Sequence, residues 1–231
     1  MLFLYIRHGD PIYSPDSLTE LGHKQAEALK HRLKLAGIDE IYASSSTRAI
    51  MTATPTAEML GLPIIKLDWC HEDLAAKDFF HENNGKSRWC FDDEETASLF
   101  NSPEVRALDR DWYDHPAFAG RNYKKGYQRV ARETDAFFES LGYRHRPELN
   151  GYEAINPSEK CVALFAHAGF GLLFLSNVLD IPYPLYSTRF TIGHTGVTAI
   201  QFDVDKKIVY PRVLQHSGDS HLFAAGLPTD Y

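Results

Sequence analysis

Cysteine is scarce in this chain of 231 residues, and long apolar runs are missing. The cysteines Cys70, Cys90 and Cys161 are far apart and odd in number, which fits neither a CxxC pair nor the ligand spacing of a zinc site. We expect three reduced thiols and no bound metal. No stretch approaches the roughly 18 apolar residues that span a bilayer, so we expect no membrane partner. The first residues, MLFLYIRHG, lack the basic region and cleavage site of a signal peptide, which predicts a cytoplasmic location.

Positive charge is also in deficit. The chain has 24 Lys and Arg residues against 31 Asp and Glu residues, and its formal net charge is −7. Such a chain has no overall attraction to a polyanion, so nucleic acid is not an expected partner, although a local basic pocket can still bind a small anion. The composition is that of a soluble globular protein, and the length favours one domain over residues 1–231 with a large insertion. The sequence does not indicate an oligomeric state.

Apolar runs and helical patterns alternate at both ends of the chain. The apolar run at residues 2–6 predicts a buried strand. A helix follows, with its N-cap at Ser17, which forms a capping box with Glu20, or at Thr19. Further predicted elements are strands at 40–43, 62–67 and 160–166 and helices at 47–60 and 169–179. This order predicts a three-layer α/β/α sandwich with a mostly parallel sheet and at least one edge strand running the other way.

The region from about residue 74 to residue 156 is aromatic and highly charged, and its clearest element is a helix predicted at 121–141. We interpret this region as a helical insertion that lies over the sheet edge as a cap. Its basic residues include Arg88, Arg106, Arg121, Lys124 and Lys125. The cap could form a lid or a specificity wall, or it could be only a packed, solvated cover. After it, strands are predicted at 195–202 and 207–214, joined by a turn at 203–206.

Cationic or imidazole side chains follow three of the predicted strands. His8, next to Arg7, comes directly after the first strand, Arg48 enters the helix after the second, and His167 follows the strand at 160–166. Parallel topology brings these junctions to one sheet edge, where ligands bind in open α/β folds. An imidazole can attack phosphorus, and a guanidinium can hold phosphoryl oxygens in a fork. The three junctions together predict a phosphate site.

Four motifs together resemble a known family. They are LFLYIRHGD at residues 2–10, LTELGHKQAEAL at 18–29, IYASSSTRAIMTAT at 41–54 and VALFAHAGF at 162–170. In order and spacing they resemble the histidine phosphatase superfamily, which includes the cofactor-dependent phosphoglycerate mutases. The resemblance covers roughly the first 75 and the last 75 residues and leaves the middle unmatched. It implies a phosphoglycerate mutase-like fold.

The resemblance also implies a mechanism. His8 would be the nucleophile that becomes phosphohistidine, and Arg7, Arg48 and His167 would bind the phosphoryl group and stabilise its transition state. Neighbouring guanidinium groups should keep His8 neutral and therefore nucleophilic. The implied activity is that of a metal-independent phosphomonoester hydrolase, a phosphatase of the histidine acid phosphatase type, which needs no cofactor and acts on a small phosphorylated metabolite.

A general acid is still needed for the leaving oxygen. The family commonly places a glutamate after the third strand, and Glu72 stands there, with Asp73 and Asp68 as alternatives. A carboxyl group beside Trp69 could have a raised pKa and keep its proton near neutrality. Glu72 could also be an ordinary surface carboxylate.

The loop after His8 departs from the mutase pattern. Gly9 would let the backbone approach closely, and Gly9 and Ser14 are candidates for phosphate or substrate binding, but the loop is short. Hydrolysis is therefore favoured over the alternative of a phosphoglycerate mutase-type phosphotransferase. A low-turnover protein that binds a phosphorylated ligand on the same scaffold is a further alternative. His194 and His221, near the C-terminal end, are expected to be structural.

Overall fold

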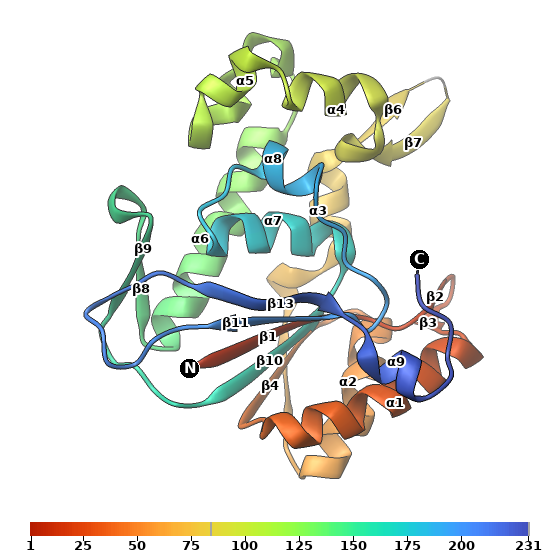
Figure 1. Ribbon diagram of the computed structural model, residues 1–231. Helices are drawn as coiled ribbons and strands as arrows, with labels where there is room; N and C mark the ends of the chain where they lie inside the picture. The colour runs from red at the N-terminus through yellow and green to blue at the C-terminus, as the bar shows by residue number, and fades with distance from the viewer. Residues whose placement is uncertain (84, 231) are drawn as a thin grey trace.

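The centre of the molecule is a six-stranded sheet (Figure 1). The computed structural model describes residues 1–83 and 85–230. In spatial order the strands are β13 (Arg212–Gly218), β11 (Val197–Gln201), β1 (Leu2–Arg7), β10 (Cys161–Ala166), β4 (Glu40–Ser44) and β5 (Ile64–Leu67). The apolar runs of β1 and β10 occupy the middle and are buried, as expected for strands covered on both faces. The predicted α/β fold with a mostly parallel sheet is confirmed.

The prediction of a reversed edge strand is wrong in its position. β1, β10, β4 and β5 run parallel to one another. β11 is antiparallel both to β1 and to β13, so the reversed strand lies inside the sheet and the edge strand β13 runs in the direction of β1. The sequence shows two consecutive strands after the last helix pattern, but it does not show which of them pairs with the parallel strands.

The strand predicted at 207–214 is two separate strands. β12 (Ile208–Val209) pairs with β9 (Gly151–Ala154), whereas β13 pairs with β11. Pro211 lies between β12 and β13, and proline has no N–H to donate to a strand ladder. β9 also pairs with β8 (Tyr143–Arg146), which gives a small sheet in the order β12-β9-β8. The predicted turn at 203–206 therefore belongs to a longer connection between β11 and β13.

Two helices, α1 (Glu20–Ala36) and α2 (Thr47–Leu60), cover one face of the main sheet. Leu33 of α1 and Ala53 of α2 share a core with Ile6 of β1. α1 begins after Thr19, whose hydroxyl accepts a backbone N–H three residues further on, so Thr19 is the N-cap. Ser17 instead belongs to β3 (Asp16–Leu18), which forms a hairpin with β2 (Pro11–Tyr13).

Three helices pack on the opposite face and complete the three layers (Figure 1). They are α3 (Glu72–Phe79), α6 (Tyr123–Ser140) and α7 (Ala168–Val178), and α8 (Tyr183–Ser187) packs on the outer side of α7. Aromatic rings join this layer to the sheet: Phe3 contacts Phe138 at 5.1 Å between ring centroids, and Tyr5 stacks on Phe174 at 5.4 Å. α7 is buried along nearly its whole length, which explains why its sequence is apolar on all sides.

Four elements lie on the outer side of this helical layer, away from the main sheet (Figure 1): β6 (Phe80–Asn83), β7 (Lys86–Trp89), α4 (Glu94–Phe100) and α5 (Pro103–Ala107). Short 3-10 helices lie at Asp68–Cys70, Cys90–Asp92, Asp109–Asp114, Pro116–Phe118 and Pro147–Leu149, and α9 (Ser220–Ala224) packs against α1. Trp112 is buried against Phe100 and Tyr183. Within the described residues, no helix combines the length and apolar character needed to cross a membrane.

Candidate active site

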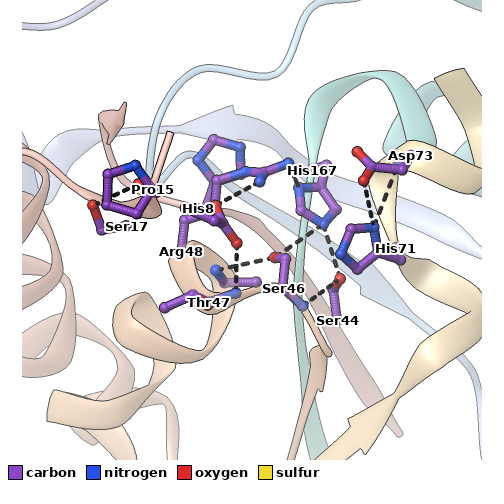
Figure 2. Close-up of polar contacts among 12 residues, drawn as sticks. His8, Pro15, Ser17, Ser44, Ser46, Thr47, Arg48, His71, Asp73 and His167 are labelled. Atoms are coloured by element: carbon purple, nitrogen blue, oxygen red, sulfur yellow. Dashed lines mark hydrogen bonds and ion pairs between the residues drawn. The ribbon is translucent and has the colours of Figure 1, made fainter. Parts of the chain in front are cut away.

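A cavity of about 640 Å³ opens at the carboxyl ends of β1 and β4 and beside the start of α7. It is lined by Arg7, His8, Tyr13, Asp16, Arg48, His71, Glu72, Asp73, Ala76, Phe80, Trp89 and Ala168. Figure 2 shows His8, Arg48 and His167 converging from three different junctions of strand and helix. The parallel strands therefore bring together the groups that the sequence placed at separate junctions.

His8 has a defined tautomer. Its Nδ1 lies 2.7 Å from the carbonyl oxygen of Gly9, which can only accept, so Nδ1 carries the proton and Nε2 carries the lone pair. Burial lowers the pKa of His8 well below its usual value, and the charges of Arg7 and Arg48 lower it further. The hydrogen bond to Gly9 raises this pKa but does not offset the lowering. The ring is therefore neutral at physiological pH, and its Nε2 carries a lone pair that can act as a nucleophile.

Gly9 fixes the turn that carries His8. Its N–H donates to Oγ1 of Thr52 at 2.9 Å. A Cβ at Gly9 would lie only 2.7 Å from the carbonyl oxygen of Gly22 in α1. The close backbone approach that the sequence indicated is thus an approach to α1, and Gly9 is not among the residues that line the cavity.

Arg48 lies in the first turn of α2 and is held from several sides. Its Nη1 donates to Oδ1 of Asp16 at 2.7 Å, and the other oxygen of Asp16 accepts the N–H of Thr47 at 2.7 Å. The ring of Tyr13 lies 5.4 Å from the guanidinium carbon. Only 5% of Arg48 is exposed. The β2–β3 hairpin therefore fixes the position of this cation in the cavity.

His167 is fully buried behind Arg48. Nη2 of Arg48 donates to its Nδ1 at 3.1 Å, and its Nε2 lies 2.9 Å from Oγ of Ser44, to which it donates. Burial, followed by the nearby His8 and Arg48, lowers the pKa of His167 well below its usual value. The sequence indicated that His167 could donate to phosphate, and this stays a prediction. In this arrangement a neutral His167 accepts from Arg48, and its ring centroid lies 5.2 Å from that of His8.

Glu72 occupies the first position of α3 and faces the start of α7. Its two carboxyl oxygens accept the N–H groups of Gly169 and Phe170, each at 3.0 Å. Burial raises the pKa of Glu72 to about 7, although these N–H groups and the two cavity arginines favour the charged form. A protonated fraction therefore persists near neutrality, as a general acid requires.

The alternatives to Glu72 are less suitably placed. Asp73 lines the cavity but is exposed, and Asp68 is exposed and is not among the lining residues. Trp69, expected beside Glu72, packs against Phe170 in the core. Phe80 and Trp89, and not Trp69, are among the aromatic residues that line the cavity.

The two remaining predicted binding residues differ in placement. Arg7 lines the cavity, donates from Nη1 to the carbonyl oxygen of Ile192 at 2.7 Å and lies 3.7 Å from Oδ2 of Asp230. Ser14 is exposed at the tip of the β2–β3 hairpin and is not among the lining residues. The structure therefore brings His8, Arg7, Arg48 and Glu72 to one cavity and leaves Ser14 outside it.

Sequence reasoning missed several residues of this cavity. Asp16, Tyr13, His71, Phe80 and Trp89 line it, and no motif in the sequence identified them. They come from a short hairpin, a helix N-cap and the region without family resemblance.

The two C-terminal histidines that were expected to be structural differ in their distance from His8. The ring centroids of His194 and His8 are 5.8 Å apart, and Nδ1 of His194 lies 3.0 Å from Oδ1 of Asp230. A signal for His194 existed, because it precedes an antiparallel strand, whose start lies at the edge where parallel strands end. His221 contacts Oγ1 of Thr195 at 2.9 Å and is not among the lining residues of the cavity.

Residues 4–75 match the family model described as histidine phosphatase superfamily (branch 1). Over these residues the chain is similar to the histidine phosphatase superfamily. The resemblance that the motifs indicated is therefore confirmed. The matched part contains His8, Arg48 and Glu72, and it ends where the aromatic, charged region begins. No curated protein is similar enough in sequence to match.

Solved structures of phosphatases share this fold over nearly the whole chain. A mycobacterial glucosyl-3-phosphoglycerate phosphatase matches with a TM-score of 0.60 at 18% identity, covering 94% of this chain and 98% of its own. A phosphoserine phosphatase from Entamoeba histolytica, in complex with 3-phosphoglyceric acid, has a TM-score of 0.59 at 16% identity, with 96% and 98% covered. The alpha-ribazole phosphatase from Shigella flexneri has a TM-score of 0.58 at 18% identity, with 95% and 97% covered. At these identities the likeness establishes the fold.

Proposed function

We propose that this chain is a metal-independent phosphomonoester hydrolase of the histidine acid phosphatase type that acts on a small phosphorylated metabolite through a phosphohistidine. The observation that carries the proposal is the tautomer of His8. A neutral imidazole with its Nε2 lone pair available lines a cavity that also holds Arg7, Arg48 and a carboxyl group of raised pKa. This combination supplies a nucleophile, charge stabilisation and a proton donor for phosphoryl transfer.

In the first step, Nε2 of His8 attacks phosphorus and the ester P–O bond breaks. The leaving oxygen takes the electron pair of that bond and accepts the proton of the Glu72 carboxyl group. Arg7 and Arg48 stabilise the charge on the phosphoryl oxygens, and Arg48 is already oriented by Asp16 and His167. The products of this step are the free alcohol, phosphohistidine and a Glu72 carboxylate.

In the second step, water attacks the phosphohistidine. The P–N bond breaks, and its electron pair returns to Nε2 of His8. The Glu72 carboxylate accepts a proton from the attacking water, so the same residue is the acid of the first step and the base of the second. Inorganic phosphate leaves, and the enzyme returns to its starting protonation state.

The test is p-nitrophenyl phosphate hydrolysis with EDTA present, for wild type, His8→Ala and the control His31→Ala, in which an exposed histidine of α1 is removed. We expect turnover in wild type and control and a loss of at least about 10⁴-fold in His8→Ala. Turnover that survives in His8→Ala contradicts the proposal. Isomerisation of a phosphoglycerate without phosphate release would indicate the mutase-type alternative, and stoichiometric ligand binding without turnover would indicate the binding protein.

A further inference from the structure

The cavity has two ends of different chemistry. Arg7, His8 and Arg48 form the phosphate end. Beyond Glu72, the lining residues are His71, Asp73, Ala76, Phe80 and Trp89, which we call the leaving-group end. Glu72 and Ala76 are four residues apart in α3, so one face of this helix extends from the proposed proton donor along this end, and Phe80, the first residue of β6, follows directly after the helix. A leaving group attached to a phosphate at His8 would lie against these residues.

Among the described lining residues, the leaving-group end has no lysine or arginine to pair with a second anion. Among the described residues that line the cavity, the Lys and Arg side chains are Arg7 and Arg48, both at the phosphate end. The side chain of Asp73 is 85% exposed and borders the leaving-group end. A carboxylate or second phosphate on the leaving group would face the Asp73 carboxylate, with no lysine or arginine among the described lining residues of this end to pair with it.

Aromatic side chains dominate the same end. Trp89 and Phe80 meet edge to face, with ring centroids 4.6 Å apart, and Phe91 stacks on Trp89 at 5.6 Å. Trp89 is also packed tightly on the start of α7, since a Cβ at Gly169 would lie 2.1 Å from the indole. This wall is therefore fixed by its packing, and such walls bind planar apolar groups with little loss of conformational entropy.

We propose that the preferred substrates are monophosphate esters with an uncharged aromatic or heteroaromatic leaving group, which packs on Trp89 and Phe80. Asp73 disfavours esters with a second anionic group, such as phosphoglycerates. The cavity volume of about 640 Å³ is sufficient for a phosphate and a ring system together. This inference rests on the proposed phosphatase function and names its substrate class.

The test compares benzyl phosphate, glycerol 3-phosphate and 3-phosphoglycerate. All three release aliphatic alcohols, so differences in kcat/KM report recognition more than the basicity of the leaving oxygen. We expect wild type to prefer benzyl phosphate to glycerol 3-phosphate by at least about tenfold and to 3-phosphoglycerate by at least about a hundredfold. An equal or reversed ranking overturns the inference.

Variants separate the aromatic contribution from the charge. Trp89→Leu and Phe80→Leu should each lower kcat/KM for benzyl phosphate by about tenfold and change glycerol 3-phosphate by less than about threefold. The control Phe223→Leu removes a ring that is 83% exposed and is not among the lining residues, and it should change neither substrate. Equal losses on both substrates in the cavity variants overturn the aromatic assignment.

Asp73→Lys should raise kcat/KM for 3-phosphoglycerate by about tenfold relative to benzyl phosphate, because it replaces a repulsive charge with an attractive one. An unchanged ratio in this variant overturns the role of Asp73. If no ester is hydrolysed, the proposed function fails, and the substrate inference is decided by calorimetric binding of the same three esters to wild type. Benzyl phosphate must then bind most tightly and 3-phosphoglycerate most weakly, and any other ranking overturns the inference.

Discussion

The two ends of the cavity are built in different ways. At the phosphate end, strand termini and first helical turns supply the groups, and hydrogen bonds fix each one: His8 to Gly9, Arg48 to Asp16 and His167. At the leaving-group end, a helix face and the β6–β7 hairpin supply mainly apolar surface. The proposed nucleophile His8 is 3% exposed, whereas Phe80 at the leaving-group end is 39% exposed.

The difference reflects two physical requirements. Charge that develops on a phosphoryl group is stabilised only by donors that are already in position, so the phosphate end depends on the rigid sheet. Recognition of a leaving group needs shape and charge complementarity, which a peripheral segment can supply without disturbing the chemistry. Changes at the first end should therefore alter turnover of every substrate, and changes at the second end should alter the ranking of substrates.

The largest effect is expected for Arg48→Ala. This change removes a cation from the phosphate end and leaves Asp16 and His167 without their shared partner. We expect kcat/KM to fall by about 10³-fold for every ester, with the substrate ranking unchanged. Arg48→Lys keeps the charge but cannot form both contacts, and it should recover only part of the loss. A loss confined to one substrate would contradict the division between the two ends.

A smaller and selective effect is expected for Glu72→Gln. Benzyl phosphate needs a proton for its leaving oxygen, whereas p-nitrophenyl phosphate releases a stable anion. We expect about a 10²-fold loss on benzyl phosphate and less than about tenfold on p-nitrophenyl phosphate. Equal losses on both esters would show that Glu72 is not the proton donor.

The pH profile gives an independent check of Glu72. Its pKa is raised from 4.5 to about 7, so the carboxyl group keeps its proton as the pH rises towards 7 and loses it above. For wild type, kcat/KM on benzyl phosphate should therefore decline above about pH 7. Glu72→Gln has no proton to lose at this position, and its profile should lack this decline.

The same division explains how much the sequence could predict. His8, Arg48 and His167 each follow a buried parallel strand, and the topology of such strands requires that these positions meet. Phe80, Trp89 and Asp16 reach the cavity through the packing of a cap hairpin and a three-residue strand, which no local pattern encodes.

The contact between Arg48 and His167 could not be predicted from the sequence either. A strand-end histidine can donate to a ligand or accept from a neighbour, and the contact with Arg48 depends on where α2 places that side chain. The mostly parallel sheet followed from alternating strand and helix patterns. The position of the reversed strand β11 did not, because the pairing of β11 and β13 with their neighbours depends on tertiary contacts.

The layer that supports the leaving-group end should respond to pH through His145. This buried ring lies between Asp135 of α6, at 2.8 Å, and Asp180 after α7, at 3.1 Å, and Arg110 also pairs with Asp180. Although burial opposes it, the contacts with Asp135 and Asp180 raise the pKa of His145 from 6.5 to about 9. The charged ring therefore stabilises the fold fully below pH 6.5, and this stabilisation is lost as the pH rises through 9.

Guanidinium unfolding of wild type and His145→Gln at about pH 6.5 and about pH 9.5 measures this contribution. Wild type should lose about 2 kcal/mol of unfolding free energy more than the variant over this interval. Other titrating groups are common to both proteins and cancel in the comparison. An identical pH dependence in the two proteins would show that His145 is not charged in the folded state.

The smallest effect is expected for Asp16→Asn, which tests whether a residue without a sequence signal belongs to the phosphate end. The amide oxygen of the new side chain could still accept from Arg48, but the charge that holds the guanidinium and the Thr47 N–H together would be lost. We expect kcat/KM to fall by about five- to tenfold, equally for benzyl phosphate and glycerol 3-phosphate. Asp205→Asn, at an exposed loop position, is the control and should have no effect. A change in the ratio of the two substrates would instead place the β2–β3 hairpin at the leaving-group end, since Tyr13 on the same hairpin also lines the cavity.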